Sequence, residues 1–171
     1  EVVGRRERMA PLGGRRVERC ELVVEVDPHG TGQVSGLVRG ASVAAVEVDG
    51  VTFGDLGLGS NIVETLVGMG AATPFPIQAA SIPAVLAGRD VLARGRTGSG
   101  KTIAFGAPLV ERVLQSQAGK RREFGRSPRA IILAPTRELA LQIDRTIQPI
   151  ARSVGLFTTQ IYGGVPQGRQ V

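Results

Sequence analysis

The stretch G-R-T-G-S-G-K-T, residues 95–102, decides how this chain folds. Its spacing, G-x-x-x-x-G-K-T, is that of a phosphate-binding P-loop. The glycines let successive backbone N–H groups turn inward and form a concave site for phosphate oxygens. Lys101 stands where its charge would meet the β- and γ-phosphates, and the Thr102 hydroxyl stands where it would ligate Mg²⁺.

The residues on both sides of the loop agree with this interpretation. Residues 90–93, D-V-L-A, are a short apolar run typical of a buried strand, and residues 102–117 carry apolar side chains at helical spacing. A helix that begins at the loop adds the positive end of its dipole to the anion site. The alternative is a chance match in a chain with 24 glycines. The strand and helix context argues against it.

The rest of the second half alternates in the same way. We expect a helix capped by Ser60 and ended by Gly68 or Gly70, and another over 77–86 after the rigid Pro-Phe-Pro of residues 74–76. A strand over 130–134, an amphipathic helix over 136–154 and a third strand over 157–161 follow. Alternating strands and helices predict an α/β fold with a parallel sheet.

Residues 1–50 are a different kind of sequence. They hold two arginine-rich clusters, near Arg5 and Arg15, and no recognisable motif. We therefore expect a weakly structured or disordered extension over 1–50 and the α/β domain over 51–171. The lone His29 lies in a turn signal, D-P-H-G, and is expected to be solvated rather than a metal ligand.

The chain carries no targeting signal that we can identify. Its first residues alternate Glu and Arg without an apolar run, and the single Cys20 excludes an internal disulfide. Residues 65–88 are uncharged and long enough to span a bilayer, but Pro74, Pro76 and Pro83 interrupt them. These features predict a cytoplasmic protein with no membrane partner.

The charge is unevenly distributed. Residues 1–50 hold seven arginines against eight acidic residues, whereas residues 51–171 hold fourteen basic residues against seven acidic ones. The basic excess lies in the half with the P-loop and indicates a polyanionic partner besides nucleotide. The alternative is that this charge serves solubility alone.

Several motifs make the second half resemble the DEAD-box RNA helicases. Residues 70–78, G-A-A-T-P-F-P-I-Q, resemble the Q motif of that family, and Phe53 stands seventeen residues before it as the upstream aromatic. A glutamine amide at Gln78 matches the N6/N7 edge of adenine, and the Phe53 ring could stack on the base. The alternatives are a core aromatic at Phe53 and a helix-surface amide at Gln78.

Two further elements resemble RNA-binding motifs of the same family. Residues 135–139, P-T-R-E-L, resemble motif Ia, where a helix N-terminus, the Thr136 hydroxyl and the Arg137 guanidinium can hold an RNA phosphate. The alternative for Thr136 is a helix N-cap with a partial capping box. Tyr162-Gly163-Gly164 resembles the downstream GG element, although a Gly-Gly pair alone is only a turn signal.

The resemblance implies a RecA-like domain of an ATP-dependent RNA helicase. Such a domain binds ATP with Mg²⁺ and contacts the sugar-phosphate backbone of RNA, so that binding tolerates different RNA sequences. The residues expected to bind ATP are Phe53, Thr73, Gln78, Arg96, Thr97, Gly98, Ser99, Gly100, Lys101 and Thr102. Lys101 and Thr102 are the expected catalytic residues, and Thr102 is the expected metal ligand. The residues expected to contact RNA are Pro135, Thr136, Arg137, Gly163 and Gly164.

The family's Asp-Glu-Ala-Asp motif is missing after the P-loop. The only acidic residues beyond Lys101 are Glu111, Glu123, Glu138 and Asp144. The Ser-Ala-Thr motif and the second domain are missing too, so the chain is expected to be an incomplete RecA-like domain. Two other interpretations stay open: a truncated module that binds nucleotide or RNA without catalysis, and a P-loop ATPase of another kind.

Overall fold

The computed structural model describes residues 48–93, 95–119 and 128–164, and their ordered elements are four helices. These are α1 (Ser60–Gly68), α2 (Pro76–Leu86), α3 (Lys101–Gln117) and α4 (Arg137–Ser153). All four helices expected from the sequence are therefore confirmed, with bounds that differ by one or two residues. The expectation for the extension over 1–50 falls almost wholly outside the described residues.

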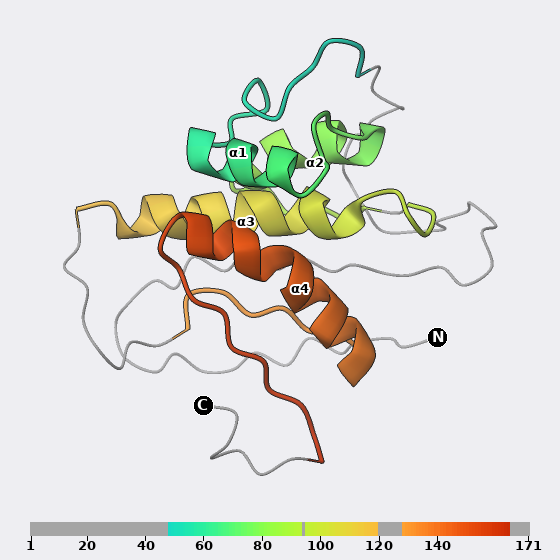
Figure 1. Cartoon of the computed structure of the whole chain (residues 1–171), viewed down its shortest axis with the longest axis vertical. Helices are drawn as coiled ribbons and strands as arrows, with labels where there is room; N and C mark the ends of the chain where they lie inside the picture. The colour runs from blue at the N-terminus through green and yellow to red at the C-terminus, as the bar shows by residue number, and fades with distance from the viewer. Residues whose placement is uncertain (1–47, 94, 120–127, 165–171) are drawn as a thin grey trace.

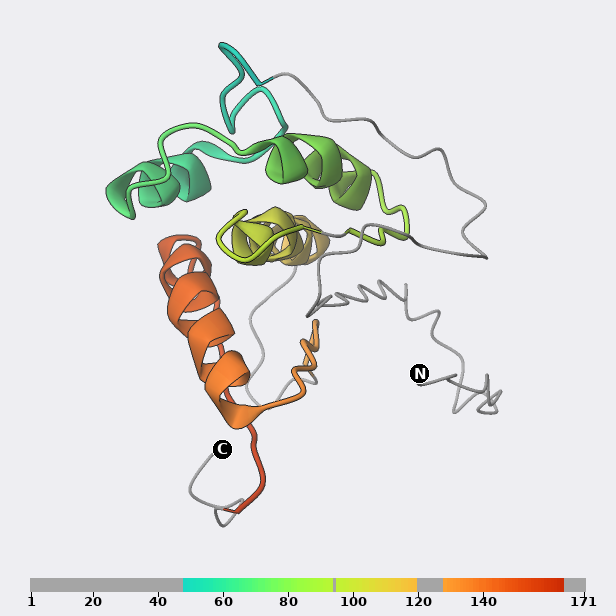
Figure 2. The same cartoon turned by 90° about the vertical axis from the view of Figure 1, so that its right-hand side faces the viewer.

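Helix α3 lies at the centre of the arrangement (Figure 1). Helices α1 and α2 lie on one side of it and α4 on the other, which is clearest when α3 is seen end-on (Figure 2). The contacts between elements agree, because α3 packs on both α2 and α4, and α1 reaches α4. The helix that begins at the P-loop is thus held from two sides.

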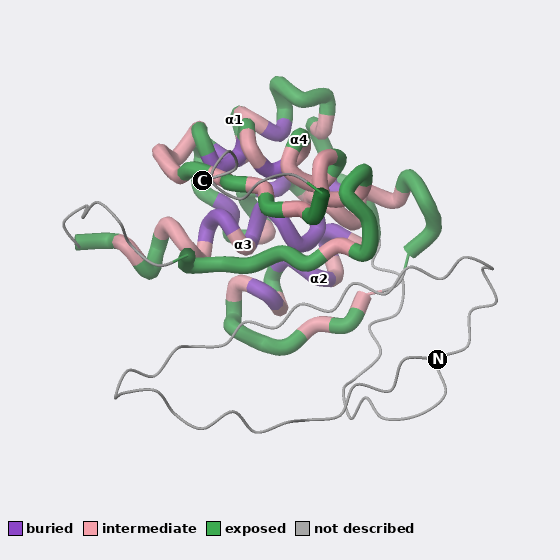
Figure 3. The backbone as a smooth tube through the Cα atoms, turned by 90° about the horizontal axis from the view of Figure 1, so that it is seen from below, coloured by how far each residue is buried: buried purple, intermediate pink, exposed green. Residues whose placement is uncertain are grey.

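A single apolar core fills the space between these helices, and the buried stretches of the backbone meet there (Figure 3). Helix α1 contributes Ile62 and Leu66, spaced four residues apart on one face. Helix α3 contributes Phe105 and Val110, and α4 contributes Ile147 and Ile150. Because the same core buries side chains from α1, α3 and α4, it sets where the loop before α3 lies.

Two glycines and one buried carboxylate tie the layers together. A Cβ added at Gly106 of α3 would lie 2.7 Å from Ile147 Cγ1, so α3 and α4 approach closely at this point. On the other side of α3, Glu111 Oε2 accepts a hydrogen bond of 3.0 Å from the Gly59 amide at the start of α1. The same carboxylate accepts from Gln115 Nε2 at 2.9 Å, which keeps it paired although it is buried.

The N-cap of α1 differs from the expectation, whereas the N-cap of α4 is Thr136, the alternative stated for that residue. The N-cap of α1 is Gly59, with no side-chain cap, and Ser60 is the first helical residue. The expectation that Ser60 caps this helix is therefore wrong, because Glu111 from α3 takes the amide at the helix start. Thr136 is the N-cap of α4, and its hydroxyl accepts from the Leu139 amide at 3.2 Å.

The three expected strands are not formed within the described residues. Residues 90–93, 130–134 and 157–161 are extended or irregular, and Leu92 alone takes part in a single β-bridge. Leu133 is 89% exposed and Phe157 is 87% exposed. The physical reason is that a strand is stable only when its N–H and C=O groups pair with a neighbour, and no ladder joins these segments. The apolar pattern predicted the three strands from local sequence, but it gave no information on which neighbour each strand would pair with.

Among the described helices, none combines the length and the apolarity needed to cross a bilayer. Helix α2, which lies in the uncharged stretch, has only 11 residues. The uncharged stretch is interrupted between the end of α1 at Gly68 and the start of α2 at Pro76, whereas Pro83 lies inside α2 without breaking it, so the expectation for Pro83 is wrong.

Candidate phosphate-binding site

The loop before α3 has the backbone geometry of an anion site. Gly98 and Gly100 adopt positive φ angles of 82° and 77°, which put them in the left-handed region. Gly100 is the N-cap of α3, and its carbonyl accepts the first helical hydrogen bond, from the Ala104 amide at 3.0 Å. The amides of the first turn before Ala104 have no acceptor inside the helix, so they are directed at whatever lies in front of its N-terminus.

The Lys101 side chain folds back over the loop. Its Nζ donates hydrogen bonds to the Gly95 carbonyl at 2.6 Å and to the Arg96 carbonyl at 2.7 Å. Both acceptors are neutral, and an ammonium group binds a phosphate oxygen more strongly than a neutral carbonyl. The lysine is therefore placed at the loop and held by contacts that an anion could replace.

Ser99 carries an unsatisfied polar atom in the same loop. Its Oγ is buried without a hydrogen-bond partner, while its backbone amide donates to the Arg96 carbonyl at 3.2 Å. A Cβ added at Gly95 would lie 2.5 Å from this hydroxyl, so only glycine leaves room for it. A buried hydroxyl without a partner is uncommon and costs free energy. The loop thus offers a phosphate oxygen a positive charge, outward amides and a hydroxyl in need of a partner.

Gln78 connects this loop to helix α2. It is 2% exposed, its Oε1 accepts from the Phe75 amide at 2.7 Å, and its Nε2 donates to the Gly100 carbonyl at 3.0 Å. Any Cβ at Gly100 would overlap this amide nitrogen, which explains glycine there independently of its φ angle. Gln78 is therefore not the surface amide that we held open as the alternative. Its amide joins the N-terminal ends of α2 and α3.

The sequence matches the family described as DEAD/DEAH box helicase over residues 75–171. The chain belongs to the DEAD/DEAH box helicase family. It is 42% identical over 123 residues to DEAD-box ATP-dependent RNA helicase 9, mitochondrial, of Arabidopsis thaliana, covering 72% of this chain and 20% of the relative. It is 44% identical over 110 residues to DEAD-box ATP-dependent RNA helicase 3A, chloroplastic, of Zea mays, covering 64% of this chain and 14% of the relative.

Two solved DEAD-box structures show which fold the helices belong to. The RNA helicase Prp28 from Chaetomium thermophilum bound to ADP matches with a TM-score of 0.60 at 34% identity, over 70% of this chain and 28% of that one. A DEAD box protein from Methanococcus jannaschii matches with a TM-score of 0.55 at 34% identity, over 70% and 31% of the two chains. The predicted RecA-like α/β class is therefore confirmed, and the described residues form part of its helical layer.

Phe53, expected to stack on the base, has another place in this DEAD-box chain. Its ring is 0% exposed and packs in the core with Leu58, Ile62 and Leu66. The turn that carries it is held by Asp55, which accepts from the Thr52 amide at 2.9 Å and the Thr52 hydroxyl at 2.7 Å. These hydrogen bonds lower the pKa of Asp55. In this arrangement Phe53 is the core aromatic that the sequence left open, and neither ring face reaches solvent.

The other expected nucleotide-site residues are exposed or half-buried. Arg96, Thr97 and Gly98 are exposed, Thr102 is half-buried in the first turn of α3, and Thr73 is exposed just before the buried Pro74.

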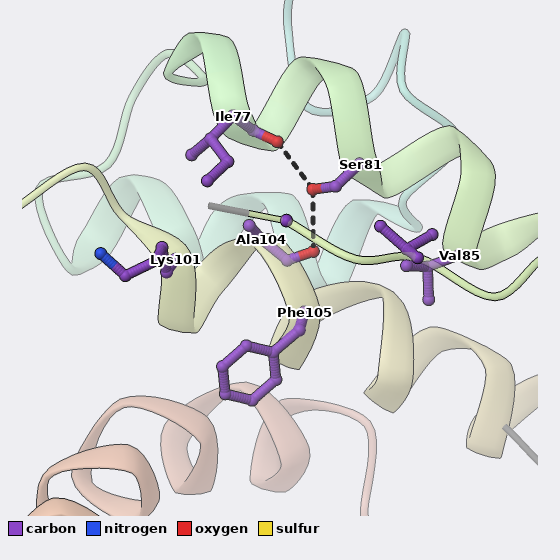
Figure 4. Close-up of a pocket in the computed structure, with 8 residues that line it drawn as sticks. Ile77, Ser81, Val85, Lys101, Ala104 and Phe105 are labelled. Carbon is purple, nitrogen blue, oxygen red and sulfur yellow. Dashed lines mark hydrogen bonds between the residues drawn. The ribbon is translucent and has the colours of Figure 1, made fainter. Parts of the chain in front are cut away.

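Beside the loop, α2 and α3 leave a small apolar pocket that Lys101 borders (Figure 4). Ser81 lines this pocket. Its Oγ donates to the Ile77 carbonyl at 2.7 Å and lies 3.5 Å from the Ala104 carbonyl. Pro108, four residues on, cannot donate to that carbonyl.

One cation–π contact joins the two segments that were expected to contact RNA. The Arg137 guanidinium lies over the Tyr162 ring, 4.4 Å from its centroid, which joins the start of α4 to the GG element. Pro135, Thr136, Gly163 and Gly164 are exposed, and Gly164 has a φ of 83°. The two segments that resemble motif Ia and the GG element thus meet at this contact, although 25 residues separate Arg137 from Tyr162 along the chain.

Two aromatic residues of the site were missed by sequence reasoning. Tyr162 was noted as part of a motif, but its role under Arg137 depends on a contact that no local pattern shows. Phe75 was noted as part of the rigid Pro-Phe-Pro segment and of the stretch that resembles the Q motif, but no contact with the loop before α3 was assigned to it. Its place between two prolines and just before a helix start was the signal, because the backbone of such a residue is restricted to one region.

Proposed function

We propose that this chain is the ATP-binding part of an ATP-dependent RNA helicase. The observation that supports the proposal is the loop of residues 95–102, which carries Lys101 Nζ, the unpaired Ser99 hydroxyl and the first-turn amides of α3. The relatives support it by their names, but this chain spans only 14–20% of their length. The activity of a whole helicase therefore remains a proposal for the protein that contains this chain.

The first-turn amides of α3, the Lys101 side chain and the Thr102 hydroxyl each have a separate role in the proposed site. The amides at the start of α3 bind the β-phosphate oxygens, and Lys101 exchanges the Gly95 and Arg96 carbonyls for the β- and γ-phosphates. The Thr102 hydroxyl would hold Mg²⁺ together with phosphate oxygens, and the metal would neutralise charge that develops on them. Mg²⁺ usually keeps several water ligands and binds through one or two protein groups together with substrate phosphates, so a single hydroxyl at Thr102 fits such a site.

RNA is the proposed polyanionic partner. Arg137, the α4 N-terminus and the Gly163-Gly164 turn would contact its phosphates, independently of base sequence. The excess of fourteen basic over seven acidic residues in 51–171 favours this partner. A cytoplasmic location remains a prediction from the sequence, since the named relatives are mitochondrial and chloroplastic proteins.

The proposal is tested by titrating the chain with ATP and with inorganic tripolyphosphate in a calorimeter. Lys101→Ala should weaken both ligands by tenfold or more, because it removes the charge that meets the phosphates. Lys120→Ala is the matched control, since Lys120 is the only other lysine of the chain and lies outside the P-loop. Equal affinities for the unsubstituted chain and Lys101→Ala would contradict the proposed phosphate site.

A further inference from the structure

We propose that Tyr162 is a positioning residue for RNA binding, which holds the Arg137 guanidinium at the start of α4 where its N–H groups can bind an RNA phosphate. The inference rests on the proposed RNA contact of Arg137 and adds the residue that orders this side chain. Two contacts between α4 and the segment after it support the inference.

The segment after α4 runs back along the helix that precedes it. Gln160 Nε2 donates a hydrogen bond to Asp144 Oδ2 in the middle of α4. Two residues further along the segment, the Tyr162 ring lies under Arg137, which stands about two helical turns before Asp144. The segment is thus held to α4 at two points, and it passes from the C-terminal end of the helix toward its start (Figure 1, Figure 2).

These contacts make the Tyr162 ring a fixed surface for Arg137. Tyr162 is half-buried, whereas Arg137 is exposed, and the Arg137 Cζ atom lies 4.4 Å from the centroid of the ring. The Gln160 contact two residues earlier restrains the backbone that carries the ring. An arginine side chain in solvent samples many rotamers, so a ring at this position restricts it before any RNA arrives.

A ring leaves the guanidinium available to a phosphate, which a carboxylate would not. The cation–π attraction acts between the positive charge and the face of the ring, so it requires no N–H donor. Within the described part of the chain, the Arg137 side chain makes no hydrogen bond or ion pair. A carboxylate in the same place would neutralise the charge and occupy the N–H groups with which a guanidinium binds phosphate. Arg137 can therefore bind a phosphate while it stays on Tyr162.

The gain from the ring is preorganisation of the arginine. Ordering a free arginine side chain at the moment of binding costs conformational entropy, which reduces affinity. When Tyr162 already orders Arg137, less of this cost falls on the binding of RNA. Because the contact is made to a phosphate, the gain should not depend on base sequence.

The test is a titration of a fluorophore-labelled single-stranded oligouridylate with the chain at several salt concentrations. Tyr162→Leu removes the π-face but keeps an apolar side chain, and it should weaken binding by about three- to thirtyfold, up to the full rotamer entropy of an arginine side chain. Tyr162→Phe keeps the ring and should stay within about twofold of the unsubstituted chain. Phe157→Leu is the matched control, an exposed aromatic residue earlier in the same segment, and should have no effect.

The salt dependence separates positioning from a direct contact of the ring with RNA. Each phosphate contact on a single strand contributes about −0.7 to the slope of log affinity against log salt. Tyr162→Leu should lower the size of this slope toward that of Arg137→Ala, although it changes no charge. In the Arg137→Ala background, Tyr162→Leu should cost less than about twofold, because the side chain that the ring positions is absent.

The affinity for tripolyphosphate, measured on the same variants, reports on the fold around the P-loop. It should be unchanged in Tyr162→Leu, because α2 and α3 hold that loop. If Tyr162→Leu loses tripolyphosphate binding together with RNA binding, the ring only supports the fold and the inference is overturned.

The inference is also overturned if Tyr162→Leu leaves the RNA affinity and the salt slope unchanged, or if it weakens RNA binding equally with and without Arg137. The first result would make the contact purely structural, and the second would show that the ring contacts RNA itself. If Arg137→Ala binds RNA as tightly as the unsubstituted chain does, or that chain binds no RNA, the proposed RNA contact fails, and the inference fails with it. Arg137→Ala alone therefore distinguishes a failure of the proposed function from a failure of the inference.

Discussion

At the scale of single residues, the site is defined by hydrogen bonds that cross between elements. Lys101 donates to the carbonyls of Gly95 and Arg96, and Gln78 joins the Phe75 amide to the Gly100 carbonyl. Each bond restrains the loop in front of α3. The chemistry of the loop therefore depends on side chains whose motif positions were visible in the sequence, but whose partners were not.

Gln78→Ala should destabilise the chain as well as alter nucleotide binding. It removes two hydrogen bonds and leaves the Phe75 amide and the Gly100 carbonyl without these partners, which costs about 1–3 kcal/mol when such groups are buried. Urea unfolding of the chain measures this cost. The sequence-based expectation, that this variant weakens ATP relative to GTP, is checked by titrating both nucleotides.

Gln78→Glu is the control for that prediction. It keeps an oxygen that can accept from Phe75 but replaces the donor to Gly100 with a carboxylate oxygen at a buried position, so its cost combines the lost bond to the P-loop with the burial of a charge and should exceed that of Gln78→Ala. If Gln78→Ala shifts the ATP-to-GTP ratio without loss of stability, Gln78 acts on the base rather than between α2 and α3.

At the scale of elements, the position of α3 is what the fold provides for the site. Its N-terminus carries Lys101, its middle crosses α4 at Gly106, and its Glu111 holds the start of α1. Shape complementarity at one glycine and one buried carboxylate thus determines how three helices meet.

Gly106→Ala should destabilise the chain despite the better helix propensity of alanine. The new methyl group would lie 2.7 Å from Ile147 Cγ1, and overpacking costs about 1–3 kcal/mol against a propensity gain of about 0.5–1 kcal/mol. Thermal or urea unfolding measures the balance. Adding Ile147→Ala should make the two effects non-additive, because the side chain in conflict is removed.

Gly68→Ala in α1 is the matched control. A Cβ at Gly68 meets nothing within 4 Å, so this variant should be neutral or more stable. Equal effects at Gly68 and Gly106 would show that α3 and α4 do not cross as closely as the structure describes.

At the scale of the whole molecule, the described residues form helices around one core and leave extended apolar segments exposed. Ile131, Leu133, Phe157 and Ile161 are all exposed, in two of the three segments that were expected to be strands. Exposed apolar segments with unpaired backbone groups favour self-association. The phosphate loop is nevertheless assembled, because its position depends on α2 and α3 and not on these segments.

The 171-residue chain alone should show no RNA-stimulated ATP hydrolysis. No Asp-Glu pair follows Lys101 in its sequence, and hydrolysis without positioned water and charge compensation loses most of its acceleration, about 10³–10⁵ for an arginine finger alone. Phosphate release with and without single-stranded RNA measures this. Stimulated turnover that is lost in Lys101→Ala would contradict the expectation.

The same chain should still bind RNA weakly, with an affinity that falls as salt rises. Arg137→Ala should weaken binding and lower the salt dependence by about one phosphate contact, whereas Arg145→Ala, elsewhere on α4, serves as the control. An affinity that does not change with salt would argue against phosphate contacts.

Local patterns alone determined the helices and the P-loop. Helical periodicity, the P-loop glycines, the prolines before α2 and the Thr136 cap act within a few residues, so they can be read directly along the chain. Only the tertiary structure decided that Phe53 is a core residue, that Gln78 bridges two helices, that Glu111 replaces Ser60 at the start of α1, and that Phe75 faces the loop. The hydrogen bonds behind these outcomes join residues far apart in the sequence, 22 positions for Gln78 and Gly100 and 52 positions for Gly59 and Glu111. The strands fail for the same reason, because a strand needs a partner that its own sequence does not supply.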